Sequence, residues 1–255
     1  MPAATDRTRV AIVGGGIGGL AAAAFLHRAG IEATVYEQAQ ALTEVGAGLI
    51  VAPNAARLLR RLGGLTRLAE HAVALQTGWE FRRWADGRVL FSQELGDECV
   101  RRYGEQCYVM HRADLLDVLR AAVPPAWLRL NHRLTGLREV DDRPELTFAD
   151  GSRAVADLVV GADGVHTTVG GYVARAGVPR FSGLCAYRCL VPAGQAPEFA
   201  RRPVQTLWLG PGHHLVHYPI RAGTVVNIVA ITPAGDWTAE SWSAQGRIED
   251  LRAAF

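Results

Sequence analysis

A glycine-rich turn near the N-terminus constrains the fold of this 255-residue chain more than any other feature. The turn, Gly14–Gly19, has the spacing Gly-x-Gly-x-x-Gly and follows the short apolar run Val10–Val13. The alanine-rich segment Leu20–Ala29 comes next and predicts a helix, and Ala33–Tyr36 predicts a second strand. A buried strand, a glycine turn, a helix and a strand in this order predict a dinucleotide-binding unit with a right-handed crossover.

Each glycine of the turn has an expected task. Gly14 permits the tight turn, Gly16 lets a pyrophosphate approach the backbone, and Gly19 lets the helix pack closely on the strand. The helix N-terminus supplies unpaired N–H groups and a partial positive charge for the phosphates. Glu37 lies at the end of the second predicted strand, where an acid binds an adenosine ribose. The turn itself leaves open whether the dinucleotide is NAD or FAD, and the alternative is a structural turn followed by a surface glutamate.

Composition excludes several other classes of protein. The chain is 49% apolar and 20% charged, which argues against disorder, and all 27 basic residues are arginine, which excludes lysine-based catalysis. A net charge of +2 gives little attraction for nucleic acid. The four cysteines lack zinc-ligand spacing, so we expect no metal site, reduced thiols and a cytoplasmic location. The uncharged run Val10–Leu26 is short and rich in glycine, so we expect no membrane span.

The rest of the chain predicts further helices and an antiparallel region. Trp79–Phe91 predicts a hairpin around Asp86-Gly87, Arg112–Ala122 a helix, and Asp157–Gly161 another buried strand. After about Phe181, antiparallel strands are expected at 186–191, 204–209, 214–219 and 225–231. A last helix is expected over Ser243–Phe255, with Ile248, Leu251 and Phe255 on one buried face. That helix has no cap before the final residue, so we expect that the chain is cut short.

Several further stretches resemble one family, the single-component flavoprotein aromatic hydroxylases, and within it the salicylate, 3-hydroxybenzoate and 6-hydroxynicotinate branch. The resemblance covers the whole chain, and its most specific motif is the Asp163-Gly164 stretch. It implies an α/β fold in which a Rossmann-like FAD-binding domain (1–78 and 101–178) is interleaved with an antiparallel-sheet substrate domain (79–100 and 179–255). The stretches that carry it are Val35–Ala39, Gly46–Gly48, Pro53–Ala55, His111–Leu115 and Gly161–His166.

The resemblance also implies roles for individual residues. The glycine turn (Gly14, Gly16, Gly18 and Gly19) and Glu37 hold the ADP part of FAD, Arg112 contacts the flavin side, and Asp163 and Gly164 belong to a motif implicated in FAD and NAD(P)H binding. Gln38 and Leu134 are further candidate cofactor contacts. No separate nicotinamide domain is expected.

A strand near residue 214 carries the candidate catalytic residues. His214 and Tyr218 match an H-x-x-x-Y pair that lies at the substrate in the hydroxybenzoate and hydroxynicotinate members. Strand alternation places both on one face, with Cα atoms about 13 Å apart, so they can line one pocket without sharing a proton. His214 is suited to accept a phenolic proton. The alternatives are an exposed strand histidine and a tyrosine in the core; His217, on the other face, is the less favoured candidate.

The activity that the resemblance implies is hydroxylation of a small hydroxylated aromatic acid, with FAD as cofactor, NADH or NADPH as electron donor and O2 as oxidant. Ile50 replaces a histidine of the hydroxynicotinate members, which argues mildly against that substrate. A homodimer is one option for the assembly.

Two departures from the family keep other readings open. Gly170 stands where the family often has an arginine, and no later Gly-Asp motif, usually followed by Ala-Ala-His-Pro, is present to hold the flavin. One alternative is therefore a truncated FAD-binding module without turnover. The other is an NAD-dependent dehydrogenase, which keeps the glycine turn but leaves Asp163-Gly164 unexplained.

Overall fold

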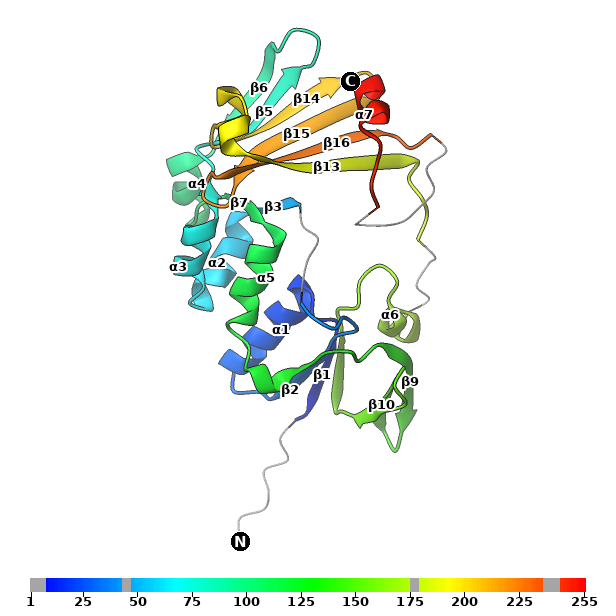
Figure 1. Cartoon of the computed structure of the whole chain (residues 1–255). Coiled ribbons are helices and arrows are strands. Elements are labelled where there is room, and N and C mark those ends of the chain that lie inside the picture. The colour runs from blue at the N-terminus through cyan, green and yellow to red at the C-terminus, as the bar shows by residue number, and fades with distance from the viewer. Residues whose placement is uncertain (1–7, 43–46, 175–178, 236–243) are drawn as a thin grey trace. The chain divides into compact units, whose positions relative to one another are not determined.

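The computed structural model describes residues 8–42, 47–174, 179–235 and 244–255 (Figure 1). The chain forms two compact units, and each is built from two separate segments. Unit 1 comprises Met1–Thr43 and Leu116–Arg180, and unit 2 comprises Glu44–Leu115 and Phe181–Phe255.

Unit 1 contains a four-stranded parallel sheet in the order β12-β1-β2-β8. Its strands are β1 (Val10–Val13), β2 (Ala33–Tyr36), β8 (Leu128–Arg129) and β12 (Leu158–Gly161). Helix α1 (Ile17–Arg28) connects β1 to β2, as the glycine turn predicts, so the strand-helix-strand unit is confirmed. Val13 lies opposite Tyr36 on one side and Gly161 on the other, so the carboxyl ends of three strands meet at one edge.

A small antiparallel sheet completes the core of unit 1. It has the order β11-β10-β9, and the buried cluster includes Ala11 and Val13 of the parallel sheet together with Leu146 and Phe148 of β10. The Tyr36 and Phe148 rings stack with centroids 4.6 Å apart. The bounds are β9 (Leu134–Val140), β10 (Arg143–Phe148), β11 (Arg153–Val155), α6 (Thr168–Val173) and the 3-10 turn η1 (Pro125–Trp127).

Unit 2 is organised around a six-stranded sheet in the order β13-β16-β15-β14-β5-β6. All neighbours pair antiparallel except β14 and β5, which are parallel. The predicted hairpin and the four predicted antiparallel strands are confirmed. The strands are β5 (Thr77–Arg83), β6 (Val89–Glu94), β13 (Leu184–Pro192), β14 (Val204–Gly210), β15 (His213–Ile220) and β16 (Val225–Pro233).

A second sheet and several helices belong to the same unit. The sheet has the order β3-β7-β4, formed by Gly48–Val51, Tyr108–His111 and Val73–Ala74. The helices are α2 (Pro53–Arg61), α3 (Leu65–His71), α4 (Gly96–Tyr103), α7 (Ile248–Ala254) and the 3-10 turns η2 (Ala193–Gln195) and η3 (Glu198–Arg201). Helix α5 (Arg112–Arg120) begins in unit 2.

The predicted domain boundaries differ from these units. We assigned residues 47–78 and 101–115 to the FAD-binding domain, but they group with unit 2. The reason is that these residues contact the six-stranded sheet: the Gly48 N–H donates to Asn227 Oδ1 of β16 at 2.7 Å, and Val109 of β7 packs in one buried cluster with Ile220 of β15. Compactness alone does not test which segments hold a cofactor, so the functional division stays a prediction.

The predicted last helix is shorter than expected and its buried face is wrong. Helix α7 begins at Ile248, while Ser243 lies outside the described residues. Ile248 is 52% exposed and Phe255 is 43% exposed. About two turns of helix present too little apolar surface to bury. Phe255 instead lies edge-on to Trp84, with ring centroids 6.4 Å apart.

Two further sequence expectations concern the membrane and the thiols. No helix in the described part of the chain has the length and apolar character needed to cross a membrane. The four cysteines are free, in line with the reduced thiols expected from so few cysteines in a chain of this size.

Candidate dinucleotide and substrate sites

The first and last glycines of the turn lie where no larger side chain fits. Gly14 has a φ of +103°, and a Cβ added there would overlap the Ala162 carbonyl oxygen. A Cβ on Gly19 would overlap the Gly14 carbonyl oxygen. The backbone of the turn therefore packs directly on itself and on the segment that follows β12.

Gly16 and Gly18 face open space instead. No atom lies within 4 Å of a Cβ built on either residue. Gly16 is the N-cap of α1; no side chain caps this helix end, and its first turn contains no acidic residue. The leading N–H groups of a helix lack partners within the helix and carry a partial positive charge. An open helix N-terminus of this kind can accept an anion such as a pyrophosphate, and we call it the cradle.

Glu37 fastens the turn to the end of β2. One carboxylate oxygen accepts a hydrogen bond from the Gly15 N–H at 2.6 Å, and the other accepts one from the Ala39 N–H at 2.8 Å. Each oxygen of a carboxylate has a second lone pair, so Glu37 can also accept a hydrogen bond from a hydroxyl group. Gln38, the next residue, is exposed beside it.

The cradle lies at a reversal of strand order. The chain passes from β1 through α1 to β2 on one side, whereas β12 pairs with β1 on the other side. In open parallel sheets, ligands bind at the carboxyl ends of the strands at such a switch point. The strand order thus gives a second reason, independent of the glycines, to place a ligand here.

Asp163 has a structural task at the same edge. One carboxylate oxygen accepts from the Thr167 hydroxyl at 2.6 Å, and the other accepts from the Thr168 and Val169 N–H groups at 2.7 and 3.1 Å. Asp163 therefore caps the N-terminus of α6. Gly164 follows it with a φ of +79° and turns the chain away.

Leu134 lies in the core rather than at a surface. Its side chain is 7% exposed and belongs to the same buried cluster as Val13 and Phe148. A contact with a cofactor would have to come from its backbone.

Arg112 is the first residue of α5 in unit 2. Its N–H donates to the Ala47 carbonyl at 3.2 Å, and the preceding imidazole of His111 accepts the Ala113 N–H through Nδ1 at 3.2 Å. The cap is thus supplied by His111, which is buried. This places a cation at a helix N-terminus, where the helix dipole favours a nearby anion.

His214 and Tyr218 share one face of β15 but differ in exposure. His214 is half-buried, whereas Tyr218 is 4% exposed and packs in the core of unit 2 with Val109 and Ile220. A Cβ on Gly48 would lie 2.9 Å from the Tyr218 hydroxyl, so no residue larger than glycine fits against this ring at position 48. Burial raises the pKa of Tyr218 to about 12, so its hydroxyl stays protonated at neutral pH.

Arg188 on β13 shares this face, and the sequence reasoning missed it. Residues paired across antiparallel strands point to the same side, and Arg188 pairs with Val229, which pairs with Val216 between His214 and Tyr218. Burial lowers the pKa of Arg188, and the nearby Tyr218 opposes this shift. The alternation of β13 offered a signal, because Arg188 lies between apolar neighbours on a predicted strand.

Comparison with known proteins identifies the family of the chain. The family model described as "FAD binding domain" matches residues 7–230. The chain is 44% identical over 253 residues to 3-amino-4-hydroxybenzoate 2-monooxygenase PtmB3 of Streptomyces platensis, and the match covers 98% of this chain and 63% of that protein. It is 34% identical to 6-hydroxynicotinate 3-monooxygenase of Bordetella bronchiseptica, covering 98% of this chain and 65% of the relative.

Solved structures share the fold. Klebsiella pneumoniae HpxO, complexed with FAD and uric acid, superposes with a TM-score of 0.81 at 24% identity, covering 99% of this chain and 66% of that one. The chain thus spans just under two thirds of the length of the curated relatives it matches. With residues 7–230 matched, this chain belongs to the FAD-binding-domain family of the flavin-dependent aromatic hydroxylases.

Proposed function

We propose that the chain binds FAD through the cradle of unit 1 and hydroxylates a small hydroxylated aromatic acid, using NADH or NADPH and O2. The observation that carries this proposal is the open, uncapped N-terminus of α1 beside Gly16 and Gly18, at the switch point between β1 and β12. When bound, FAD supplies the redox chemistry, taking electrons from the nicotinamide and passing them to O2.

The residues around the cradle have separate tasks in this proposal. Backbone N–H groups from Gly16 onward bind the pyrophosphate, and the spare lone pairs of Glu37 accept the ribose hydroxyls. Arg112 contributes a positive charge to the flavin side. Asp163 acts through the position of α6 and of the turn at Gly164, because its carboxylate already accepts three hydrogen bonds.

The face of β15 with His214 and Tyr218 carries the proposed substrate chemistry. His214 takes the phenolic proton, which makes the aromatic ring more electron-rich. Tyr218 cannot act as a base at neutral pH because its pKa is about 12, so it is a hydrogen-bond donor or a positioning residue. Arg188 pairs with the carboxylate of the acid. The name of the Streptomyces relative makes 3-amino-4-hydroxybenzoate the first substrate to test.

The competing proposal is an FAD-binding module that does not turn over. The chain spans 63% of the length of the Streptomyces relative, so groups needed for turnover can lie in the remainder of such proteins. An NAD-dependent dehydrogenase is the third candidate, and it differs by binding NAD without flavin.

One experiment separates these functions. The FAD-loaded chain is mixed anaerobically with NADH or NADPH, with and without 3-amino-4-hydroxybenzoate, and the absorbance of the flavin is followed. O2 is then added, and the mass of the product is measured by mass spectrometry. We expect flavin bleaching that the aromatic acid accelerates, and a product heavier by one oxygen atom. Bound flavin without product would establish the module, and NAD binding without flavin would establish the dehydrogenase.

Arg188→Gln refines the substrate assignment. We expect the KM for the acid to rise about ten-fold or more through loss of a charge-assisted hydrogen bond, and the KM for the matching carboxamide to change little. Equal increases for both compounds would remove Arg188 from the substrate site. Arg138→Gln, on the exposed strand β9 of unit 1, is the control.

A further inference from the structure

The six-stranded sheet of unit 2 has a cavity on the face opposite His214 and Tyr218. Its volume is about 400 Å³, and that size suits a small organic molecule. Strand alternation separates the two faces: Leu215 and His217 point into the cavity, whereas His214 and Tyr218 point the other way. The lining residues are Trp84, Val191, Gln195, Ala196, Pro197, Phe199, Ala200, Trp208, Leu215, His217, Val226, Ile228 and Phe255.

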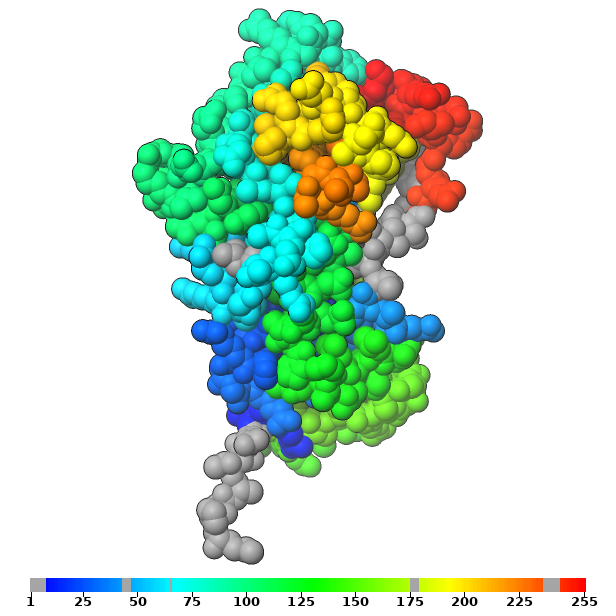
Figure 2. Space-filling view, turned by 60° about the vertical axis from the view of Figure 1, so that its left-hand side comes forward, coloured from blue at the N-terminus to red at the C-terminus, as the bar shows by residue number. Residues whose placement is uncertain are grey.

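The walls of the cavity are mainly apolar and include four Phe or Trp side chains. Phe199 lies edge-on to Trp208 and to His217, with ring centroids 5.9 and 5.7 Å apart. Phe199 is 49% exposed and Phe255 is 43% exposed, so the mouth of the cavity is open to solvent. A bound ligand would cover the rings of these two residues. The segment with η2 and η3, which carries Ala196 and Phe199, lies on the surface of unit 2 (yellow in Figure 2).

Two polar side chains line this cavity, the exposed Gln195 and the buried His217. The side chain of His217 is 4% exposed, and neither ring nitrogen has a hydrogen-bond partner among the described residues. Burial and the nearby Arg82 lower the pKa of His217 to about 4, against smaller opposing effects from Glu80 and the Ala200 backbone. The imidazole is therefore neutral at pH 7. The Ala200 backbone lies near enough to raise its pKa as a hydrogen-bond acceptor would, but the contact falls outside hydrogen-bond geometry, so the donor and the acceptor nitrogen can both pair with a ligand. Such a buried group costs free energy until a ligand or water pairs with it.

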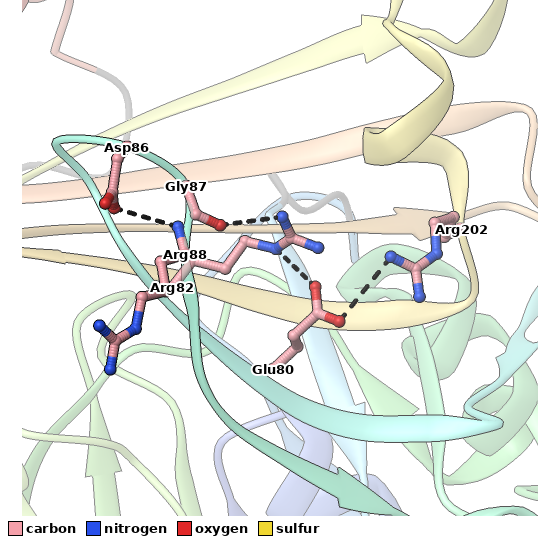
Figure 3. A network of polar contacts seen from close by, with 6 residues as sticks. All are labelled: Glu80, Arg82, Asp86, Gly87, Arg88 and Arg202. Atoms are coloured by element: carbon pink, nitrogen blue, oxygen red, sulfur yellow. Dashed lines mark hydrogen bonds and ion pairs between the residues drawn. The ribbon is translucent and has the colours of Figure 1, made fainter.

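The charged side chains next to the cavity pair with one another and do not line it. Arg82 Nε donates to Glu80 at 2.6 Å, and its Nη1 donates to the Gly87 carbonyl at 3.2 Å. Arg202 Nη1 lies 3.8 Å from the other Glu80 oxygen (Figure 3). The Arg82 guanidinium also lies over Trp208, 5.6 Å from the ring centroid. No lining side chain among the described residues carries a charge at neutral pH, so the cavity offers an aromatic acid no side-chain ion-pair partner, which favours an uncharged ligand.

We propose that this cavity is a second ligand site, which binds an uncharged planar aromatic molecule whose hydroxyl group hydrogen-bonds to His217. Flat rings match the walls formed by Phe199 and Trp208. The inference does not rest on the proposed hydroxylase activity, because the site lies on the other face of the sheet from His214.

The test uses 2-naphthol and naphthalene as matched probes on the 255-residue chain. Binding is followed by fluorine NMR of protein labelled with fluorotryptophan and assigned through single Trp→Phe variants. Trp84 and Trp208 line the cavity, and Trp79 lies on the opposite face of β5 from Arg82. We expect 2-naphthol to shift the first two resonances and leave that of Trp79 in place.

Two variants test the assigned contacts. His217→Phe should weaken 2-naphthol about ten-fold, by removing one hydrogen bond, and leave naphthalene unchanged. Ala196→Phe should block both probes by filling the cavity, whereas Ala149→Phe, in an exposed turn of unit 1, should block neither. A circular dichroism melt confirms that each variant is folded.

Four results would overturn the proposal. The first two are that the unaltered chain binds neither probe, and that 2-naphthol shifts the resonance of Trp79 instead of that of Trp208. The third is that His217→Phe binds 2-naphthol as tightly as the unaltered chain does. The fourth is that the unaltered chain binds 3-hydroxybenzoate more tightly than 2-naphthol. The last two remove the hydrogen bond to His217 and the preference for an uncharged ligand, respectively.

Discussion

Gly16 and Gly19 lie three residues apart in the same turn and meet opposite surroundings. A Cβ on Gly19 would overlap the backbone of Gly14, whereas a Cβ on Gly16 would enter empty space. The motif therefore combines glycines that the protein needs for its own packing with glycines that it keeps clear for a ligand. Sequence spacing alone assigns these tasks by analogy, and the contacts separate them.

The first prediction compares Gly19→Ala with Gly18→Ala. Gly19→Ala should lower the free energy of unfolding by about 3 kcal/mol, because α1 must move away from β1. Gly18→Ala, in the same helix, should leave it unchanged or raise it by up to about 1 kcal/mol through better helix propensity. Urea unfolding measures both, and equal stability of the two variants would contradict the packing role of Gly19.

The second prediction concerns pH and His217. Its pKa is about 4 in the folded chain, below the ordinary value of 6.5, so between these values the unfolded chain binds more protons than the folded chain. The contribution of the neutral imidazole to the free energy of unfolding is fully present above pH 6.5 and is lost as the pH falls toward 4. From pH 7 to 5, the unaltered chain should lose about 2 kcal/mol more than His217→Phe.

Urea unfolding at the two pH values checks this difference. Other groups titrate in the same range, which is why the comparison with the variant is needed. Parallel losses in both proteins would show that His217 is not held neutral.

At the scale of elements, α6 shows how a cap and a loop are built together. Asp163 and Thr167 cap the helix, and the Gly170 N–H donates to the Thr167 hydroxyl oxygen at 2.7 Å. A Cβ on Gly170 would overlap the Thr167 side chain. The sequence showed Gly170 only as a departure from the family pattern, and the structure gives the local reason for it.

The third prediction tests this cap. Asp163→Ala should lower the free energy of unfolding by about 1–2 kcal/mol, because three donors at the start of α6 lose their acceptor. Asp163→Asn, which keeps one acceptor oxygen, should cost less. Asp117→Ala is the control: its ion pair with Arg120 is exposed, so the change should stay below about 0.5 kcal/mol. Thermal unfolding followed by circular dichroism ranks the stability of the three variants. If Asp163→Ala leaves the free energy of unfolding unchanged, the capping role of Asp163 is contradicted.

Elements with a strong local pattern could be predicted from the sequence. Strand β1, the turn and α1 combine an apolar run, a glycine spacing and an alanine-rich helix, and the strands of the six-stranded sheet are separated by Pro and Gly turns. Helices α3 and α4 and strand β3 were missed, because they are short and have little periodicity of their own. The cap formed by Asp163 and the burial of Tyr218 against Gly48 depend on residues distant in sequence, which local patterns do not record.

At the scale of the whole molecule, two separate cores explain why each unit uses two stretches of chain. Leu146 belongs to the core of unit 1 and Ile220 to that of unit 2, and both side chains are completely buried. The sequence indicated two interleaved domains, but contacts at β3 and β7 shift residues 47–78 and 101–115 to the second unit.

The fourth prediction follows from these cores. Leu146→Ala should cost about 2–5 kcal/mol, and it should speed hydrogen exchange in residues 8–42 and 116–174 together, although they are far apart in sequence. Ile220→Ala should act on residues 47–115 and 181–235 instead. Peptide-resolved mass spectrometry measures both, and a uniform increase along the chain in either variant would show that the two units open as one.

We propose above that the cradle at the start of α1 holds the pyrophosphate of FAD. The most direct test of this proposal is the visible absorption spectrum of the chain after FAD has been added and unbound FAD has been removed by desalting. We expect the unaltered chain to keep a flavin band with altered fine structure. Gly16→Ala should fold with the same melting temperature, because its Cβ meets no protein atom, and bind FAD about ten-fold more weakly or worse. A folded but colourless unaltered chain, or equal FAD affinity in Gly16→Ala, would contradict the claim.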